Sequence, residues 1–144
     1  MARNLKPVTK TELNKPHLIL FPKHGSETQG FLVPFENLPF VIAHVYCIGP
    51  VPENEVRGNH AKKKNTQVLV AIGGKAEIWL ESPEGEESYF QLEGNDKGLL
   101  IPNGYWRKAK LHKGCYLIGL HSMQYDASDY VKDYEEFKKM GNRL

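Results

Sequence analysis

The sequence predicts an all-β protein, a small jelly-roll barrel with one short C-terminal helix. About nine short apolar runs recur along the chain at intervals of roughly 8 to 12 residues, and most are bounded by Gly, Pro or Asn. No helical segment lies between these runs, and only residues 128–139 place apolar side chains at helical spacing. Residues 1–144 are therefore expected to form a single domain, long enough to bury a sizeable core.

The predicted strands alternate with turn-forming residues. The first three are residues 17–21, 31–35 and 40–48, with residues 23–30 as a turn. A polar stretch then leads into an apolar strand that stops at Gly73-Gly74, which we interpret as a hairpin-type turn. The strands that follow are residues 75–80, 88–92, 98–101, 105–110 and 115–121, and the last two are expected to pair.

The two ends of the chain differ from this pattern. Residues 1–16 are polar and contain two prolines, so we expect a flexible arm or an edge strand there. At the other end, Ser128 suits the N-cap of a helix that packs on the barrel with its tyrosines in the core. The residues at helical spacing are Tyr130, Val131, Tyr134 and Phe137.

Charge, hydropathy and cysteine content favour a soluble protein of the cytoplasm. The formal net charge of +2 is nearly balanced and gives no reason to expect a nucleic-acid or membrane partner. The N-terminus has no apolar signal region, and no run approaches the ~18 apolar residues of a membrane span. Cys47 and Cys115 lie in apolar runs, so free buried thiols are expected rather than a disulfide.

A polar segment around His60 brings titratable side chains next to a buried strand. Residues two apart in a strand share a face, so His60 and Lys62 would point the same way and Ala61 the other. A histidine and a lysine in this position are costly to bury unless a ligand or partner charges meet them. We therefore expect the chemistry of the protein here.

Three segments of the chain resemble one family of sugar-nucleotide enzymes. The first is the run RGNHAKK at residues 57–63, followed by Gln67 and three apolar residues. The second is residues 97–102 together with Gly104 and Trp106, and the third is residues 122–137. These segments are similar to the dTDP-4-keto-6-deoxyhexose 3,4-ketoisomerases, the WxcM-like sugar-nucleotide cupins, over about residues 14–139.

The resemblance implies a cupin barrel, a homodimer, and an isomerase in deoxysugar biosynthesis for lipopolysaccharide or S-layer glycan. Such an enzyme moves the ketone of a dTDP-linked sugar from C4 to C3 through an enediolate, which needs a base and a stabiliser of negative charge. His60 would be the base, and Lys62 an electrostatic stabiliser or proton donor. Arg107 would hold the sugar or a phosphate oxygen, and Arg57 would hold the diphosphate.

Further residues in the matching segments are candidates for substrate binding. Asn59 belongs to the first of these segments, Tyr46 lies upstream in a stretch that also fits the family, and His44 stands where the family has Arg. Gln67 either orients a neighbour or ends a turn, and Trp106 is either a core aromatic or a stacking platform for thymine. Structural roles are expected for His17, His24, His112 and His121, and solvent exposure for Lys63 and Lys64.

The cupin motifs offer four positions for metal ligands, and this sequence departs from that pattern. Only His60 keeps a suitable ligand, whereas Lys62 and Arg107 at two of the other positions would repel a cation. We therefore expect no metal and no other cofactor. Lys62 also replaces the second histidine of the family motif, and Gln29 replaces an Arg.

Two functional hypotheses follow from these observations. The first is a metal-free sugar-nucleotide isomerase that uses His60 as its base, with Lys62 beside it. The second is a protein that binds a nucleotide sugar without turnover, or with an altered reaction, because Lys62 stands in place of a histidine. A metal-dependent oxygenase is disfavoured by the missing ligands.

Overall fold

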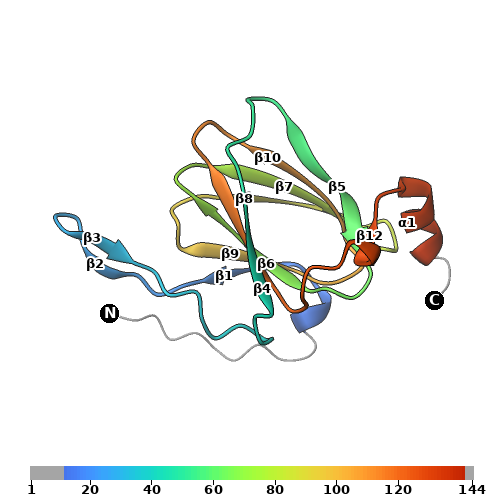
Figure 1. Ribbon diagram of the computed structural model, residues 1–144, viewed down its shortest axis with the longest axis horizontal. Helices are drawn as coiled ribbons and strands as arrows, with labels where there is room; N and C mark the ends of the chain where they lie inside the picture. The colour runs from blue at the N-terminus through green and yellow to red at the C-terminus, as the bar shows by residue number, and fades with distance from the viewer. Residues whose placement is uncertain (1–11, 142–144) are drawn as a thin grey trace.

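The structure is a computed structural model that describes residues 12–141. Two five-stranded antiparallel sheets form a sandwich, and a two-stranded hairpin projects from one side of it (Figure 1). The predicted all-β fold with a C-terminal helix is confirmed. The first sheet has the order β1 (His17–Leu20), β9 (Lys97–Ile101), β6 (Gln67–Ile72), β11 (Tyr116–His121) and β4 (His44–Ile48). The second has the order β12 (Tyr130–Val131), β5 (Val56–Lys62), β10 (Trp106–Leu111), β7 (Ala76–Glu81) and β8 (Glu87–Leu92).

The inner faces of the two sheets share one apolar core. Leu69 and Leu117 of the first sheet belong to the same buried cluster as Ile78 and Leu80 of the second. Along β7 these buried residues alternate with the partly exposed Trp79, as the period-two pattern of the sequence predicted. Burying each of the large aliphatic side chains contributes about 1.5–3 kcal/mol, so this core holds the two sheets together.

Both sheets are also covered in part on their outer faces. On the first sheet, Val33, Phe35, Leu38 and Phe40 pack against a second buried cluster that includes Val68 and Val70, which explains why β6 is apolar at every position after Gln67. On the second sheet, the helix α1 (Tyr134–Gly141) covers one end through the buried Phe137.

Two strand predictions in the first third of the chain were partly wrong. The expected turn at residues 23–30 contains β2 (His24–Ser26), which pairs with β3 (Gly30–Leu32). No strand continues over residues 33–43, and β4 begins only at His44. Pro34 and Pro39 lack the N–H that a sheet ladder needs, and the aromatic residues beside them cover the outer face instead.

The hairpin-type turn predicted at Gly73-Gly74 was also wrong. This turn carries the chain from β6 to β7, which lie in different sheets. The predicted pairing of the last two strands was wrong as well, because residues 112–115 pass from β10 to β11 between the sheets. Both turns contain a glycine with positive φ, Gly73 at +77° and Gly114 at +80°. Turn residues show where a chain reverses, but they do not determine which sheet it enters next.

The C-terminal helix is shorter than the pattern predicted. A short 3-10 turn, η2 (Ala127–Asp129), and strand β12 precede α1, so Ser128 is not the N-cap. Asp133 caps α1, because its Oδ1 accepts a 2.8 Å hydrogen bond from the Glu135 backbone N–H. Tyr130 and Val131 pair with Lys62 and Ala61 of β5, and this tertiary pairing overrides their helical spacing.

Several smaller expectations can be compared with the described residues. Cys115 is buried and Cys47 is exposed, so the expected free thiols are present but burial was wrong for Cys47. Of the expected N-terminal arm, residues 1–11 lie outside the described residues, and Glu12–Asn14 forms the 3-10 turn η1. Within residues 12–141, no helix is both long and apolar enough to cross a bilayer.

Candidate active site

At one end of the sandwich, the inward positions of the strands change from apolar to polar. There the two sheets bring together histidine, lysine, arginine, tyrosine and glutamine side chains from six strands. The first sheet contributes His44, Tyr46, Gln67 and His121, and the second contributes His60, Lys62, Arg107 and Tyr130.

A bulge in β5 determines which residues of this strand face the cluster. In the pairing of β5 with β10, Arg107 lies opposite His60, whereas Ala109 lies opposite Arg57, and the register shifts between the two pairs. Residues paired across an antiparallel ladder share a face, so Arg57 and His60 both lie on the inner side although three positions separate them. Asn59 is the exposed residue in the bulge, with φ at +51°.

His60 presents an unprotonated ring nitrogen to the space between the sheets. Its Nδ1 lies 3.0 Å from the Gly58 carbonyl oxygen, which can only accept, so Nδ1 carries the proton and Nε2 has the free lone pair. Nε2 is buried and has no hydrogen-bond partner among the described residues. Burial, together with the positive charges of Arg107 and Lys62, lowers the pKa of His60 to about 3. The imidazole is therefore available as a base across the physiological pH range.

Lys62 is an amine buried among aromatic rings, with 4% of its surface exposed. Its Nζ lies 4.9 Å from the centre of the Tyr130 ring, 5.3 Å from that of Tyr46 and 3.4 Å from Nδ1 of His121. Across residues 12–141, no carboxylate forms an ion pair with it. Burial and the charge of Arg107 lower the pKa of Lys62 to about 7, so both protonation states are accessible near neutral pH.

Arg107 is fixed in place by groups from the opposite sheet. It is 2% exposed, and its Nη1 donates to the Tyr46 hydroxyl at 3.1 Å and to Oε1 of Gln67 at 3.2 Å. Gln67 thus orients a neighbour, which is one of the two roles expected for it. The Arg107 Nε is buried and has no hydrogen-bond partner in the part of the chain that the structure describes, which leaves a donor for a bound ligand.

Two stacked histidines line the first sheet. The rings of His44 and His121 lie 4.2 Å apart and are parallel to within 1°. His44 donates from Nδ1 to the Met123 carbonyl, and the fully buried His121 receives a 2.8 Å hydrogen bond from Nδ2 of Asn65. Sequence reasoning missed His121. Leu117 and His121 are four residues apart on one strand, so alternation places both on the same, inner face.

The segment between β11 and β12 holds the turn between β5 and β6 next to the site. The carboxylate of Asp129 accepts from the backbone N–H of Lys64 at 2.9 Å and of Asn65 at 3.1 Å. Ser122 accepts from the Thr66 N–H at 2.9 Å. The side chains of Lys63 and Lys64 are exposed, as predicted. Asn65, Asp129 and Tyr130 were not predicted as site residues, because their contacts join segments far apart in the sequence.

Trp106 belongs to the core rather than to the polar cluster. Its side chain packs with Ala61, Val131 and Phe137 on the other side of the sheet from Arg107. A groove of about 570 Å³ lies on this outer face, and it is lined by Trp106 but by none of the clustered polar residues. The polar cluster itself opens through a narrow crevice bordered by His44, Lys62 and Tyr130.

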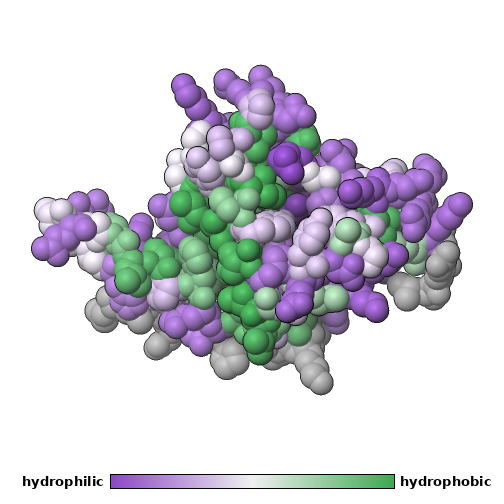
Figure 2. Space-filling model, viewed as in Figure 1, coloured by the Kyte–Doolittle hydropathy of each residue, from purple (hydrophilic) through white to green (hydrophobic). Residues whose placement is uncertain are grey.

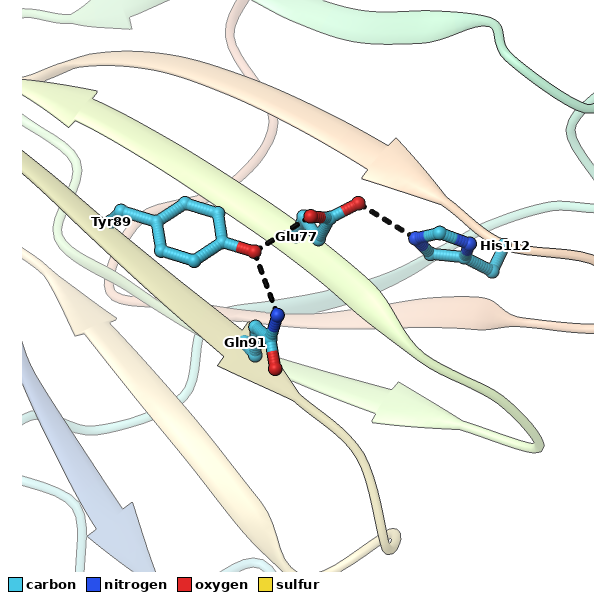
Figure 3. A network of polar contacts seen from close by, with 4 residues as sticks. All are labelled: Glu77, Tyr89, Gln91 and His112. Carbon is cyan, nitrogen blue, oxygen red and sulfur yellow. Dashed lines mark hydrogen bonds and ion pairs between the residues drawn. The ribbon is translucent and has the colours of Figure 1, made fainter.

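His112 lies outside the cluster, on the outer face of the second sheet. Its Nε2 lies 2.7 Å from Oε2 of Glu77, whose other oxygen accepts from the Tyr89 hydroxyl at 2.6 Å (Figure 3). Gln91 donates to the same hydroxyl. These bonds lower the pKa of Glu77, the Tyr89 bond contributing most, so this histidine has the structural role expected for it.

The donor set of the cluster suits proton transfer better than metal binding. Among residues 12–141, no group of three or more His, Cys, Asp or Glu side chains is placed to hold a metal ion. His60 has two cationic neighbours, Lys62 and Arg107, which would repel a divalent ion. A base beside two cations can remove a proton from a carbon acid and stabilise the resulting oxyanion.

Comparison with known proteins finds similarity to one family model and to enzymes that act on TDP-linked sugars. A family model described as FdtA, WxcM-like, C-terminal, matches residues 14–142. A TDP-4-oxo-6-deoxy-alpha-D-glucose-3,4-oxoisomerase from Aneurinibacillus thermoaerophilus is 33% identical over 117 residues, which are 78% of this chain and 84% of that protein.

Solved structures of similar proteins include two of QdtA, a sugar 3,4-ketoisomerase from Thermoanaerobacterium thermosaccharolyticum. One, in complex with TDP, is 33% identical, with a TM-score of 0.83 and coverage of 89% of this chain and 95% of the other. The second, a variant in complex with TDP-4-keto-6-deoxyglucose, is 32% identical, with a TM-score of 0.83 and coverage of 89% and 94%.

Proposed function

Because the chain belongs to the FdtA (WxcM-like, C-terminal) family, we propose that it is a 3,4-ketoisomerase of a TDP-4-keto-6-deoxyhexose. The observation that carries this proposal is the buried, unprotonated Nε2 of His60 beside Lys62 and Arg107. The relatives that bind TDP and TDP-4-keto-6-deoxyglucose support the same ligand class for this chain.

The reaction starts with loss of the C3 proton. His60 takes this proton on Nε2, the electron pair of the C–H bond forms a C3–C4 double bond, and negative charge moves to the oxygen on C4. The low pKa of His60 keeps the base free but makes it weak, so the enediolate must be strongly stabilised as it forms. Lys62 and Arg107 supply this stabilisation, in a site with little water to screen their charges.

The second half of the reaction returns a proton to C4. The hydroxyl on C3 loses its proton as the C3 ketone forms, the oxygen on C4 accepts a proton to become a hydroxyl, and C4 accepts a second proton. Lys62 is suited to donate, because a pKa near 7 lets its ammonium release a proton to the intermediate and take one up again. C3 is oxidised and C4 is reduced by the same two electrons through the enediolate, so the step needs no external oxidant or reductant.

Other residues of the cluster bind the substrate in this proposal. Arg107, aimed by Tyr46 and Gln67, holds a sugar or phosphate oxygen. Arg57 lies on the same side of β5 as His60 and is exposed, which suits contact with the diphosphate. The remaining candidates are Asn59, in the bulge, and His44, beside the crevice.

The experiment is an exchange assay with dTDP-4-keto-6-deoxyglucose in deuterated buffer, followed by proton NMR. We expect deuterium at C3 of recovered substrate and at C4 of product. The His60→Ala variant should lose at least about 10²-fold in rate, the usual contribution of a general base. His112→Ala is the matched control, since this histidine lies outside the cluster, and it should retain the wild-type rate.

Two results of this assay would contradict the proposal. Tight binding of the nucleotide sugar without exchange would favour the protein that binds without turnover. Equal loss of rate in the His60 and His112 variants would show that His60 has no specific role.

We further propose that the chain forms a homodimer through the first sheet and its hairpin. Large apolar side chains are exposed there, including Val41 at 87%, Leu32 at 65% and Val45 at 56%. Figure 2 shows hydrophobic residues gathered across this face of the molecule. Exposed apolar surface of this kind is typical of protein–protein contact, and the projecting hairpin offers a second copy an accessible arm.

We place this enzyme in the cytoplasm, in the synthesis of deoxysugars for a surface glycan such as lipopolysaccharide or an S-layer glycan. The proposed substrate, a nucleotide sugar, supports this location. A fractionation of cells that reports the protein in the membrane or periplasm would contradict it.

A further inference from the structure

Within residues 12–141, the buried amine of Lys62 has one hydrogen-bond acceptor, which is Nδ1 of His121. A lysine reaches a site through a flexible four-carbon stem, so its amine has no defined position unless something holds it. Around Lys62 the neighbours are the rings of Tyr46 and Tyr130, which attract a cation but do not direct its N–H bonds. Nδ1 of His121, 3.4 Å from Nζ, provides that direction through a long hydrogen bond, and its one lone pair is shared with Nδ2 of Asn65 at 2.8 Å.

Asn65 determines that this nitrogen is an acceptor. The Oδ1 of Asn65 accepts from the Met123 backbone N–H at 3.2 Å and from the Ser122 hydroxyl at 3.5 Å, which fixes the orientation of the amide. The Nδ2 group, a donor, therefore faces Nδ1 of His121 at 2.8 Å. Nδ1 must then hold a lone pair, and the ring proton must lie on Nε2.

Burial keeps His121 neutral. The residue is 0% exposed, and burial followed by the charge of Lys62 lowers the pKa of His121 to about 2. The ring is also enclosed by stacking on His44 and by Tyr46 at 4.3 Å between ring centres. It therefore remains a hydrogen-bond acceptor over the whole working pH range.

The charged and titratable groups around Lys62 come from every neighbouring element. Arg107 on β10 disfavours its ammonium, and Asp129 of η2 favours it from beyond hydrogen-bond distance. The others are His60 on β5, His44 and Tyr46 on β4, His121 on β11, and Tyr130 on β12. Among these, His121 is the group whose hydrogen bond to the amine is present in the structure.

We propose that His121 is a positioning residue for Lys62: its Nδ1, held as an acceptor by Asn65, fixes one N–H of the amine and leaves the other two for the substrate. A direct contact of His121 with the substrate is not part of this role. The catalytic consequence rests on the proposed isomerase function, whereas the hydrogen bond itself does not.

The test begins with the free protein, so that it does not depend on turnover. Ring ¹⁵N chemical shifts should show His121 as the neutral tautomer with its proton on Nε2. The pKa of the Lys62 amine, followed by NMR through its side-chain carbon, should be lower by about one in His121→Phe, because the ammonium loses an acceptor. His44→Phe is the matched control: it keeps an aromatic ring against His121 and should leave the Lys62 pKa in place.

The kinetic arm applies if the wild-type protein isomerises the substrate. His121→Phe should then lower kcat about 10-fold with a smaller effect on KM, and its alkaline pH limb should shift downward with the Lys62 pKa. A His121 ring protonated on Nδ1, or a Lys62 pKa unchanged by His121→Phe, would overturn the proposal. If His121→Phe does not fold, the tautomer of His121 in the wild-type protein still tests the proposal. Absence of isomerase activity would overturn the proposed function while leaving the NMR arm valid.

Discussion

Lys62 is buried as a cation without a carboxylate partner in the described chain, which is an unfavourable position for stability. Moving an ammonium out of water is costly, and Arg107 adds repulsion that the two tyrosine faces and Asp129 offset only in part. Such local conflicts are concentrated at functional sites, because a side chain selected for stability alone would be apolar here.

We predict that Lys62→Met stabilises the protein and inactivates it. Replacing an unpaired buried charge by an apolar side chain of similar length should raise the free energy of unfolding by about 1–3 kcal/mol. Urea denaturation measures this change, and the exchange assay should show loss of isomerisation. Lys63→Met is the control, since this side chain is exposed and its replacement should change stability by less than about 0.5 kcal/mol. Equal effects of the two substitutions would contradict the prediction.

The pH dependence of kcat/KM should report the same amine. His60, with a pKa of about 3, is already a free base above pH 4, whereas Lys62 loses its charge as the pH rises through about 7. If the ammonium is the required form, the rate should fall about tenfold per pH unit above that value. Lys62→Arg keeps a charge at this position, so its alkaline limb should move above pH 9. A limb near pH 7 that persists in this variant would assign the titration to another group.

Stability should decrease in acid because two histidines are buried in neutral form. The folded-state pKa values of His60 and His121, about 3 and about 2, lie below the value of about 6.5 for the unfolded chain. A depressed pKa gives stability that is complete above pH 6.5 and is lost as the pH falls toward the folded values. Each group can account for up to about 1.4 kcal/mol per pH unit in that window. Urea titrations between pH 7 and 4 measure the slope, which should be shallower in His121→Phe; an unchanged slope would contradict the assignment.

At the scale of elements, the bulge in β5 brings Arg57 and His60 to the same side of the strand. Gly58 makes the bulge possible, because its φ of +97° and its position against the Arg107 carbonyl leave no room for a side chain. A Cβ atom there would lie 2.7 Å from that carbonyl oxygen. The local backbone thus determines where Arg57, the candidate for binding the diphosphate, and His60, the proposed base, lie relative to each other.

Gly58→Ala should therefore cost more than an ordinary glycine substitution. We expect a loss of about 2–3 kcal/mol in the free energy of unfolding, from the positive φ and the clash together, and a reduced rate of exchange. Gly85→Ala is the matched control, since Gly85 has a φ of +91° but no atom of residues 12–141 lies within 4 Å of the added Cβ, and it should lose only about 1–2 kcal/mol. Equal losses in the two variants would show that the clash is relieved elsewhere.

The sequence predicted those features of the elements that depend on local pattern. Alternation along residues 76–80 gave the correct buried face, and the segments 57–63 and 97–107 gave His60, Lys62 and Arg107 of the cluster. The sequence could not predict that β12 pairs with β5, because the adjacent residues Tyr130 and Val131 fit a short strand as well as a helix. The contact of Asn65 with His121 was also out of reach, since 56 residues separate the two.

At the scale of the whole molecule, the two sheets differ in what they present outward. The second sheet carries the hydrogen-bonded network of Glu77, Tyr89 and His112 on its outer face. The first sheet and the hairpin expose large apolar side chains, and part of this surface lies close in sequence to His44 and Tyr46 of the cluster. A dimer formed through the first sheet would cover that apolar surface and leave the other outer face in contact with solvent.

This asymmetry predicts which substitutions separate the subunits. Val45→Glu and Leu32→Glu place a charge in the proposed interface, so the double variant should sediment as a monomer at concentrations at which the wild type is a dimer, as analytical ultracentrifugation can measure. Trp79→Glu tests an apolar side chain that is partly exposed on the other sheet, and it should leave the dimer intact. A wild-type monomer, or dissociation caused by Trp79→Glu alone, would move the interface away from the first sheet. Because His44 and Tyr46 share β4 with Val45, the double variant should also lower kcat/KM if the dimer contact holds this edge strand in place.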